Sequence, residues 1–468
     1  MKPKKSTFAL FFGNRGFFPS AMIAQARHDL ADVLLGQGHE VLMLEEDATR
    51  YGAVETREEA ERFANFLYQQ RGQYDGVILS LPNFGDEYGA VMALKEAGVP
   101  ILIQAYPDEL DRMGPESRRD SFCGKISVMD VFNQFGVKFT ALQPHVVEPC
   151  SVAFLANLDH FDRVCQVVRG MRGMVVGAIG ARTTPFKTVR IDELALQKYG
   201  ITVETLDLSS VIAQVEALAV DSPAYREKAA YLKEYSDWHG VPDKAFENLV
   251  RLYVVLEGIV QEYRMDAFSI RCWLELQERL GISPCVVMGV FNDLMVPAAC
   301  EVDTGSAVAM YALGLASGKP PALLDWTNNY GDDPDRCILF HCGPLPASLM
   351  TEKGHISDHL ILLNTVGAGQ SYGPNTGRIT PMDFTYSSLM TRDGEIYTYL
   401  GQVRITDDPI PADFFGVAGV AHIPNLQDVL LHVGVNGYRH HVSLTPGWVQ
   451  APLGEALAHY LDFKVTVL

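Results

Sequence analysis

Two acidic residues, Glu301 and Asp325, stand where an apolar run of the chain gives way to polar sequence. Glu301 follows Pro297–Cys300 and comes just before a predicted helix over 306–315, whose N-terminus favours an anion. Asp325 follows the apolar run 321–324, and an Asp in that position is usually a turn former. One helix and one strand fit between the two acids, so both carboxylates are expected to point into one cleft at the carboxyl end of a sheet.

A third acid, Asp303, lies between Glu301 and the predicted helix in the segment Cys300-Glu-Val-Asp-Thr-Gly305. Its position suits the N-cap of that helix, where a side-chain oxygen accepts a hydrogen bond from a backbone N–H; Thr304 is the alternative cap. We therefore interpret Asp303 as structural and Glu301 as the chemical group.

Two adjacent histidines, His440 and His441, form the third element that could do chemistry. They lie in an apolar segment that reads as a strand, and successive strand side chains face opposite ways, so at most one is expected to join a given site. One core and one surface histidine is the alternative interpretation. Two carboxylates with one imidazole would suit Mn²⁺, Mg²⁺ or Co²⁺ and leave positions open for hydroxyls or water.

The elements that must position these residues follow a repeated strand–helix order. In the first third, apolar runs predict strands at 8–13, 40–44, 76–81 and 100–105, with helices at 21–35 and 57–71. The order restarts with predicted strands at 174–181, 201–206, 267–270 and 285–288, and helical periodicity at 159–171, 193–199 and 225–263. Such alternation predicts two doubly wound, Rossmann-like α/β domains.

Beyond about residue 320 the composition changes, and Gly, Pro and Thr become frequent. Short runs at 360–363, 396–400 and 433–435 are separated by turn signals. This predicts a C-terminal antiparallel β domain, barrel-like in form. The predicted division is 1–172 for the N-terminal α/β domain, 173–320 for the central α/β domain and 321–468 for the β-rich domain.

Composition excludes several classes of protein. The 38 Lys and Arg against 57 Asp and Glu give a net charge of −19, which leaves no basic footprint for nucleic acid and disfavours an anionic membrane surface. No apolar run reaches the ~18 residues that span a bilayer. The eight cysteines form no CxxC pair, so we expect free thiols in a cytoplasmic protein rather than a thiolate zinc site.

Seven segments in a shared order give the chain a family resemblance. They are Phe11–Pro19, Leu81–Glu87, Arg118–Ser127, Ile270–Trp273, Ala299–Asp303, Leu324–Trp326 and Arg439–His441. In these segments the chain resembles the L-fucose isomerase and L-arabinose isomerase superfamily, and most closely its L-fucose isomerase-like branch, which includes sulfoquinovose isomerases. The resemblance implies a C-terminal β domain that completes the site and a Glu, Asp, His metal triad, here Glu301, Asp325 and His440, with His441 as the alternative if the local alignment shifts by one.

The resemblance also implies substrate contacts and an assembly. Arg15, Lys125, Trp326, Arg439 and His341 are the expected substrate-binding residues, and His341 is an alternative further metal ligand. Members are commonly hexamers or trimers in which a neighbouring N-terminal domain helps to close the site, so Arg15 is expected to reach across an interface. For a sulfonated sugar, Arg182 would be a further candidate cation.

The implied reaction is the interconversion of an aldose and a ketose through an enediol. Glu301 is the expected carbon base and Asp325 the group that shuttles protons among the oxygens, although the two roles are exchangeable. A divalent ion would stabilise charge on adjacent sugar oxygens. A sugar-binding protein without catalysis and a different metal-assisted sugar enzyme, an epimerase or aldolase, remain the rival interpretations. A dinucleotide oxidoreductase is disfavoured because the first βα turn lacks GxGxxG.

Overall fold

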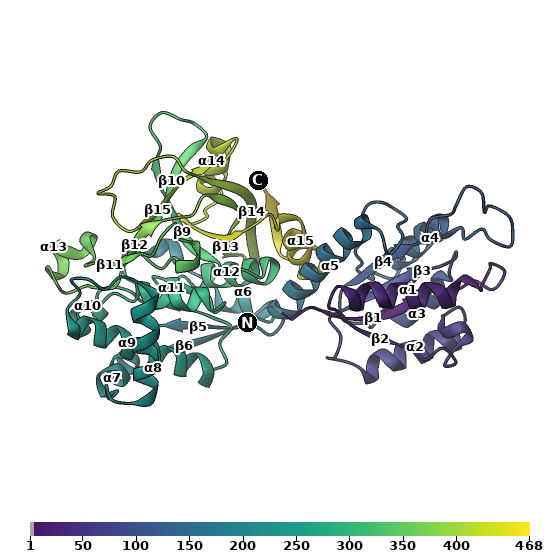
Figure 1. Ribbon diagram of the computed structural model, residues 1–468, viewed down its shortest axis with the longest axis horizontal. Helices are drawn as coiled ribbons and strands as arrows, with labels where there is room; N and C mark the ends of the chain where they lie inside the picture. Colours follow the sequence, from purple (N-terminus) through teal and green to yellow (C-terminus); the bar gives the residue numbers. More distant parts are fainter. Residues whose placement is uncertain (1–3) are drawn as a thin grey trace. The chain divides into compact units, whose positions relative to one another are not determined.

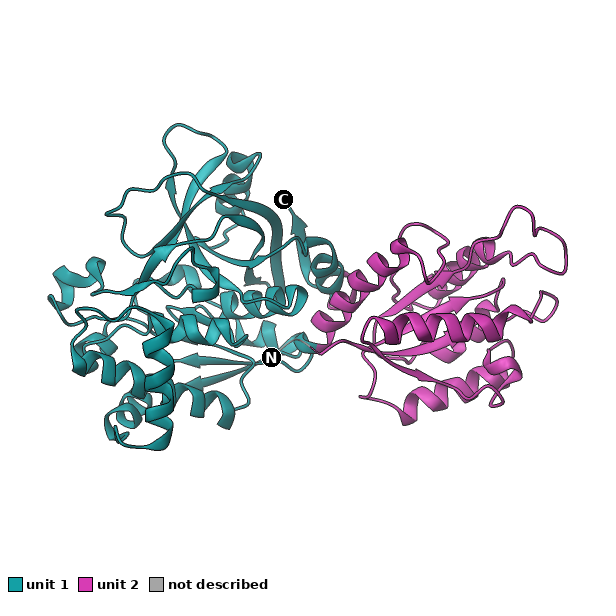
Figure 2. Cartoon of the chain, viewed as in Figure 1, with its two compact units in different colours: residues 1, 170–458, 462–468 teal, residues 2–169, 459–461 magenta. Residues whose placement is uncertain are grey.

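The computed structural model describes residues 4–468, and the chain divides into two compact units (Figure 2). Unit 2 holds the N-terminal residues up to 169 together with 459–461. Unit 1 holds 170–458 and 462–468. The predicted boundary at residue 320 lies inside unit 1 and stays a prediction.

Unit 2 is built on one four-stranded parallel sheet in the order β2-β1-β3-β4. Its strands are β1 (Thr7–Phe12), β2 (Glu40–Met43), β3 (Gly76–Leu81) and β4 (Ile101–Ala105), and its helices are α1 (Met22–Gly36), α2 (Arg57–Gln69), α3 (Glu87–Leu94), α4 (Ser121–Gln134) and most of α5 (Val152–Met171). Helices α1 and α5 pack on one face of the sheet, and α2, α3 and α4 pack on the other. Strands β1, β3 and β4 are buried at every position, which explains their continuous apolar runs.

Unit 1 begins with a second parallel sheet of the same topology, in the order β6-β5-β7-β8. Strands β5 and β6 of this sheet are labelled in Figure 1. Its strands are β5 (Val175–Ile179), β6 (Thr202–Leu206), β7 (Ala267–Ile270) and β8 (Ala298–Cys300). Its helices are α6 (Glu193–Lys198), α7 (Leu208–Ala217), α8 (Pro223–Tyr235), α9 (Asp243–Glu262), α10 (Glu275–Leu280), α11 (Cys285–Asp293) and α12 (Thr304–Ser317). The two predicted doubly wound sheets are thus confirmed.

The rest of unit 1 contains a closed antiparallel barrel. Its six strands run in the order β15-β10-β9-β16-β13-β14, and a β14–β15 pairing closes the ring. They are β9 (Ala322–Asn329), β10 (Arg336–His341), β13 (Met382–Arg392), β14 (Glu395–Thr406), β15 (Val417–His422) and β16 (His441–Pro446). The short strands β11 (His355–Ile356), β12 (Asn375–Arg378) and β17 (Lys464–Val467) extend the sheet, and α13 (Leu363–Val366), α14 (Leu426–Val435) and α15 (Gln450–Glu455) flank it. The predicted barrel-like domain is confirmed.

Helix α12 joins the parallel sheet of unit 1 to the barrel. It contacts β5 and β7 on one side and β13 and β16 on the other. Its sequence, TGSAVAMYALGLAS, is rich in small residues, and eleven of its residues are buried. Small side chains allow two layers to approach one helix closely, so α12 fixes the end of β8 against the start of β16.

Three predicted strand segments are helical instead. Residues 285–288 (CVVM) open α11, in which every residue from Cys285 to Asn292 is buried, so the run carries no periodic signal to separate helix from strand. Residues 360–363 form a 3₁₀ turn that leads into α13, and 433–435 end α14. In each case a short apolar run was ambiguous by itself.

Within residues 4–468, no helix combines the length and the apolar character needed to cross a membrane.

Candidate active site

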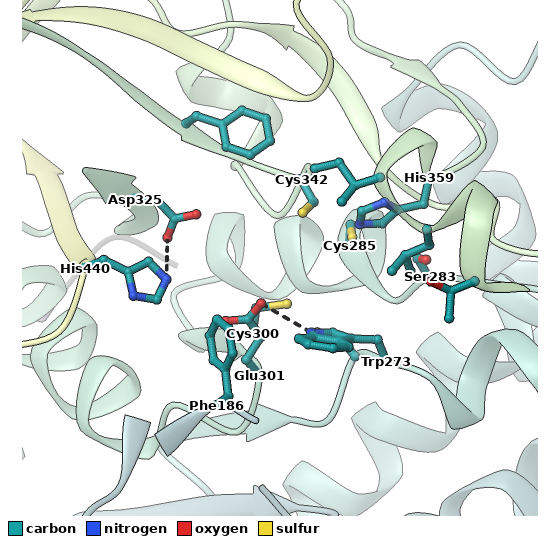
Figure 3. Close-up of a pocket in the computed structure, with 15 residues that line it drawn as sticks. Phe186, Trp273, Ser283, Cys285, Cys300, Glu301, Asp325, Cys342, His359 and His440 are labelled. Atoms are coloured by element: carbon teal, nitrogen blue, oxygen red, sulfur yellow. Dashed lines mark hydrogen bonds and ion pairs between the residues drawn. The ribbon is translucent and has the colours of Figure 1, made fainter. Parts of the chain in front are cut away.

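A cavity of about 380 Å³ opens at the junction of the parallel sheet and the barrel of unit 1 (Figure 3). Two carboxylates, two histidines and four thiols line it together with aromatic side chains. The polar and thiol groups are those of Glu301, Asp325, His359, His440, Cys272, Cys285, Cys300 and Cys342. The volume is that of a small-molecule site.

Glu301 enters the cavity from a strained turn between β8 and α12. Glu301 and Val302 both adopt left-handed backbone conformations, with φ of 63° and 57°. A non-glycine residue in that region costs about 1–3 kcal/mol, a cost that clusters at functional positions. The Trp273 indole N–H donates to Oε1 of Glu301 at 3.2 Å, which leaves Oε2 directed elsewhere.

Asp325 and His441 are brought together by strand pairing. Strands β9 and β16 are antiparallel, with Asp325 directly opposite His441, so both side chains project from the same face of the sheet. Nε2 of His441 lies 3.5 Å from Oδ1 of Asp325 and 2.9 Å from Oε2 of Glu301. The strand was expected to end at Asp325, but it continues to Asn329. The predicted meeting of the two carboxylates does occur, with His441 between them.

Asp303 binds Nδ1 of His441, the ring nitrogen that does not face Glu301 and Asp325. Nδ1 of His441 donates to Oδ2 of Asp303 at 2.7 Å, and Arg439 forms a buried ion pair with Oδ1 of the same carboxylate. Asp303 also caps α12, accepting from the Ser306 N–H at 3.0 Å, so the N-cap prediction is confirmed. With a proton fixed on Nδ1, Nε2 of His441 is the nitrogen that faces the two acids, and it can bind a metal ion once it is deprotonated.

Gly305 makes room for this ion pair. A Cβ at that position would come within 2.6 Å of Nη1 of Arg439 and 3.0 Å of the Leu389 carbonyl oxygen. The glycine in the first turn of α12 therefore reflects the close approach of Arg439.

The buried charges shift each other's pKa values. Burial opposes ionisation of Asp303, but Arg439 and His441 hold its pKa well below the usual range. Burial disfavours the His441 imidazolium, yet Asp303, Glu301 and Asp325 raise the pKa of His441 well above its ordinary value.

The two cavity carboxylates respond in opposite directions. Burial, with the neighbouring Glu301 and Asp303 charges, raises the pKa of Asp325 to about 7 despite His441. Burial also acts to raise the pKa of Glu301, but its contacts with His441, His341 and Trp273 outweigh burial and lower that pKa. Near neutral pH the site thus holds one ionised carboxylate and one that exchanges its proton.

Three atoms at the centre of the site have no hydrogen-bond partner in the described chain. They are Oε2 of Glu301, Oδ1 of Asp325 and Nε2 of His441, all buried. They converge at ion-pair distances without hydrogen-bond geometry. Buried polar atoms are rarely left so. Two carboxylate oxygens and one imidazole nitrogen are the donor set that a hard or borderline divalent cation prefers, so these residues fit a metal ion.

Other combinations of ligand atoms are also close. Glu301, His440 and His441 offer three atoms within 4.8 Å of one another, and so do Asp325, His341 and His441. His441 belongs to both groups and its side chain is 1% exposed, whereas that of His440 is 41% exposed and its Nε2 lies 3.9 Å from Asp325. The geometry favours His441, the alternative, over His440 as the ligand, and His440 lines the cavity.

Three expected substrate contacts, Trp326, Arg439 and His341, are not among the residues that line the cavity; His341 is buried close to Asp325 and His441. Trp326 faces the barrel interior, where its ring meets Tyr386 edge-on and its indole N–H donates to the Tyr399 hydroxyl at 3.3 Å. Alternation along β9 directs Trp326 away from the face that carries Asp325. Arg439 is 1% exposed and is held by Asp303. Arg439 thus positions His441 through that carboxylate.

The expected cations Arg15 and Lys125 belong to unit 2. Arg15 donates to the Gly85 carbonyl at 2.8 Å, pairs with Glu87 and lies over the Phe84 ring. Lys125 is buried, and its Nζ donates to the His145 carbonyl at 2.8 Å. Burial lowers the pKa of Lys125 to about 8. All residues that line the cavity belong to unit 1.

Sequence reasoning left out several residues at the site. Trp273 and Cys272 lie in a segment that carried the family resemblance but received no role. His359 lines the cavity from the chain that follows β11, and burial lowers its pKa to about 4. Phe186 lies edge-on to Trp273 and His440. No local pattern marks His359 or Phe186, because their place depends on tertiary packing.

Two parallel sheets, a barrel that completes the site and paired carboxylates beside imidazoles define an acid–base enzyme for a small molecule. Comparison with known proteins is specific. Residues 9–172 match the model of the fucose/sulfoquinovose isomerase N-terminal domain, and residues 339–468 match that of the L-fucose isomerase C-terminal domain.

Named relatives agree with the domain matches. A sulfoquinovose isomerase of Priestia aryabhattai is 21% identical over 412 residues, which is 87% of this chain and 89% of that protein. One of Clostridium sp. (strain MSTE9) is 26% identical over 207 residues, but that match spans 43% of this chain and 45% of the relative. A solved solute-binding protein of Burkholderia multivorans aligns over 68% of this chain and 95% of its own, at 9% identity and a TM-score of 0.18. This score is too low to indicate a shared fold.

The chain belongs to the fucose/sulfoquinovose isomerase family, as its sequence segments predicted. It is an aldose–ketose isomerase.

Proposed function

We propose that this isomerase binds one divalent ion, Mn²⁺ or alternatively Mg²⁺ or Co²⁺, through Glu301, Asp325 and His441, and moves a sugar carbonyl between C1 and C2 through an enediol. One observation carries the proposal. Three buried ligand atoms from β8, β9 and β16 converge without hydrogen-bond partners. Leaving buried polar groups unsatisfied costs about 1–3 kcal/mol each, so a bound cation is the simplest reason for the arrangement.

The bound ion would supply Lewis-acid stabilisation of negative charge on adjacent sugar oxygens. His441 must be neutral to act as a ligand, and Asp303 fixes its proton on Nδ1. Glu301 takes the proton from one carbon and returns it to the other. Asp325, with a pKa of about 7, moves protons among the sugar oxygens, because a group titrating near the working pH can both give and accept them.

The assignment of roles follows from the surroundings of the two acids. Glu301 stays ionised because His441 and Trp273 stabilise its charge, so it is ready to accept a proton. Asp325 lacks such a donor within the described chain, and its Oδ1 is without a partner. The roles remain open to exchange by experiment, since both carboxylates line the same cavity.

The substrate is a monosaccharide, with fucose-like, arabinose-like and sulfoquinovose-like aldoses as the alternatives. Among the described residues, those that line the cavity include no lysine or arginine. Arg182 lies four residues before the lining residue Phe186, but its Nη1 is bound to backbone carbonyls of residues 183, 184 and 186. A sulfonate would therefore need cations from outside the lining, and Arg15 and Lys125 of a neighbouring copy are our candidates.

A homo-oligomer, hexameric or trimeric, would bring those residues to the site. Loops after β1 and β4 of unit 2 expose large apolar side chains, among them Phe17 (79% exposed) and Leu110 (92% exposed). Exposed apolar groups gathered on loops favour an interface. We place the enzyme in the cytoplasm, because no disulfide links any of the eight cysteines in the part of the chain that the structure describes.

The test is a screen of metal-free protein against L-fucose, arabinose and sulfoquinovose, with Mn²⁺, Mg²⁺ or Co²⁺ added, for ketose formation. We expect activity only with metal, and loss of activity with EDTA that Mn²⁺ reverses. Run in D₂O, the reaction should place deuterium on the carbon that receives the proton whenever Glu301 exchanges its proton with solvent before returning it. Full activity of rigorously metal-free protein would contradict the scheme.

A further inference from the structure

Two buried histidines approach Asp325 with opposite surroundings. One ring nitrogen of His341, one of His441 and a carboxylate oxygen of Asp325 lie within 4.8 Å of one another. The rings of His341 and His441 lie 5.9 Å apart, and both side chains are buried. Distance alone would make both of them metal ligands.

The Nδ1 atoms of the two rings have opposite hydrogen-bonding roles: Nδ1 of His441 donates and Nδ1 of His341 accepts. Nδ1 of His441 donates to the Asp303 carboxylate at 2.7 Å, so Nε2 is the ring nitrogen left to bind a metal ion once it loses its proton. Nδ1 of His341 instead receives the backbone N–H of Cys342 at 2.8 Å. A backbone N–H has no lone pair to offer, so Nδ1 of His341 must be the acceptor.

The state of the His341 ring follows from this contact. An imidazolium has no lone pair on either nitrogen, so accepting a hydrogen bond requires the neutral ring. In the neutral ring with its lone pair on Nδ1, the proton resides on Nε2. That N–H is buried and has no hydrogen-bond partner among the described residues. A nitrogen that carries a proton cannot bind a metal ion.

We propose that His341 is a neutral hydrogen-bond donor to the sugar oxygen on which negative charge develops, and that it is not a metal ligand. This role rests on the proposed function of the same cavity. The buried Nε2–H acts as a fixed donor, comparable to an oxyanion-hole group, and no proton leaves it during the reaction. One ring nitrogen of His341 lies within 4.8 Å of ligand atoms of Asp325 and His441, which places the ring beside the residues proposed to serve the sugar oxygens.

The first experiment reads the ring directly. Side-chain ¹⁵N NMR on metal-free protein labelled at its 13 histidines would identify His341 as the signals that vanish in His341→Gln. We expect a neutral ring protonated at Nε2. A ring protonated at Nδ1, or an imidazolium at neutral pH, would overturn the proposal.

The second experiment separates a donor from a ligand. His341→Leu removes the N–H, whereas His341→Gln retains an amide donor at a similar distance from the backbone. We expect both variants to bind Mn²⁺ with unchanged Kd, measured by the EPR signal of free Mn²⁺. We expect His341→Leu to lower kcat by about 10²–10³-fold with little change in KM, and His341→Gln to recover part of that loss.

The outcomes distinguish the role proposed for His341 from the proposed isomerase function on which it rests. A rise in the Mn²⁺ Kd of His341→Leu and His341→Gln as large as that of His441→Asn would make His341 a ligand and overturn the inference. Equal loss of kcat in both His341 variants would also contradict a donor role. If the unaltered protein bound no Mn²⁺ and converted no aldose, the proposed function would fail, while the NMR result would still report the state of the ring. Circular dichroism identifies a variant that fails to fold, and the unaltered protein's NMR spectrum still decides the tautomer.

Discussion

The chain contains the same parallel sheet twice, and only one copy has a reactive edge. The orders β2-β1-β3-β4 and β6-β5-β7-β8 are equivalent, and polar residues follow the strand ends in both. In unit 2 these groups satisfy each other. The Asn83 amide donates to Asn14 and to the Pro19 carbonyl, its oxygen accepts from the Gly85 N–H, and Glu55 accepts from Asn14.

In unit 1 the corresponding edge lacks such closure. Glu301, which follows β8, keeps a buried oxygen without a partner, and Asp325 and His441 of the barrel strands β9 and β16 face it with unpartnered buried atoms of their own. A fold of this kind offers a position for chemistry, but the unsatisfied groups decide whether chemistry is placed there. The polar residues of unit 2 therefore fix the conformation of loops, whereas those of unit 1 leave buried polar atoms without partners and available to a ligand.

The largest effect is expected from Glu301→Gln. It keeps the shape of the side chain but removes the base, so turnover should fall by up to about 10⁴-fold. The melting temperature should stay close to that of the unaltered protein, because the amide keeps the size of the side chain and an oxygen that accepts from the Trp273 indole. Aldose-to-ketose conversion followed by chromatography is the measurement, with the exposed Glu262→Gln as the matched control. Normal activity of Glu301→Gln would remove it from the mechanism.

The adjacent histidines provide the next test. His441→Asn should raise the Mn²⁺ Kd by more than about 100-fold, since even outer partners of a metal site contribute about 10–100-fold. His440→Asn is the matched control and should change it by only a few fold, because His440 lies 3.9 Å from Asp325 and is partly exposed. Competition with a fluorescent chelator measures both. The reverse ranking would restore His440 as the ligand.

Asp303 should affect both the metal and the fold. Asp303→Asn keeps a capping side chain but leaves the buried Arg439 without its partner. We expect a Mn²⁺ Kd higher by about 10–100-fold and a free energy of unfolding lower by about 3–5 kcal/mol. Urea unfolding monitored by circular dichroism gives the second quantity. Unchanged values for both would show that the Asp303 contacts do not support the site.

The pH dependence of metal binding follows from the same charges. The pKa of His441 is raised and that of Asp325 is about 7, so both sites hold protons that an ion must displace as pH falls. Mn²⁺ affinity should therefore already weaken as pH falls below the raised pKa of His441, and more steeply below about pH 7 where Asp325 also binds a proton, by up to about tenfold per pH unit for each proton released. Calorimetry in two buffers of different ionisation enthalpy counts those protons. Binding that releases none would conflict with these pKa shifts.

The smallest effect on the site is expected from unit 2. Asn83→Ala removes hydrogen bonds to Asn14, Pro19 and Gly85 and should lower the stability of unit 2 by about 1–3 kcal/mol. The Mn²⁺ Kd should remain unchanged, because no ligand belongs to that edge. A loss of metal affinity comparable to that of Asp303→Asn would erase the contrast between the two edges.

Much of the architecture was predictable because each signal was local. Continuous apolar runs such as Gly76–Leu81 and Ala267–Ile270 became buried parallel strands over those residues. The run CVVM failed because a helix buried on all sides has no polar stripe, and a strand in the same position would look alike. Residues 360–363 failed for another reason, since Leu360 and Ile361 are more than half exposed on a short helical segment.

The site was predictable only in part. Glu301 and Asp325 could be paired because each follows an apolar run, and the strand-and-helix order brought their ends together. The choice between His440 and His441 depends on where β16 begins, and strand starts are poorly marked in sequence. Asp303 was interpreted as a cap, which it is, but its second contact with His441 is 138 residues away along the chain. No local pattern reports such a contact.

Because Asp325 of β9 pairs with His441 of β16, the site can form only after both strands have been synthesised. Glu301 and Asp325 leave the ribosome more than a hundred residues before their imidazole partner, and β16 lies close to the C-terminus. The parallel sheet of unit 2 is complete by residue 105 and can form long before that moment. A nascent chain therefore exposes the two acids before His441 exists, and the proposed cation site can form only after β16 has been synthesised.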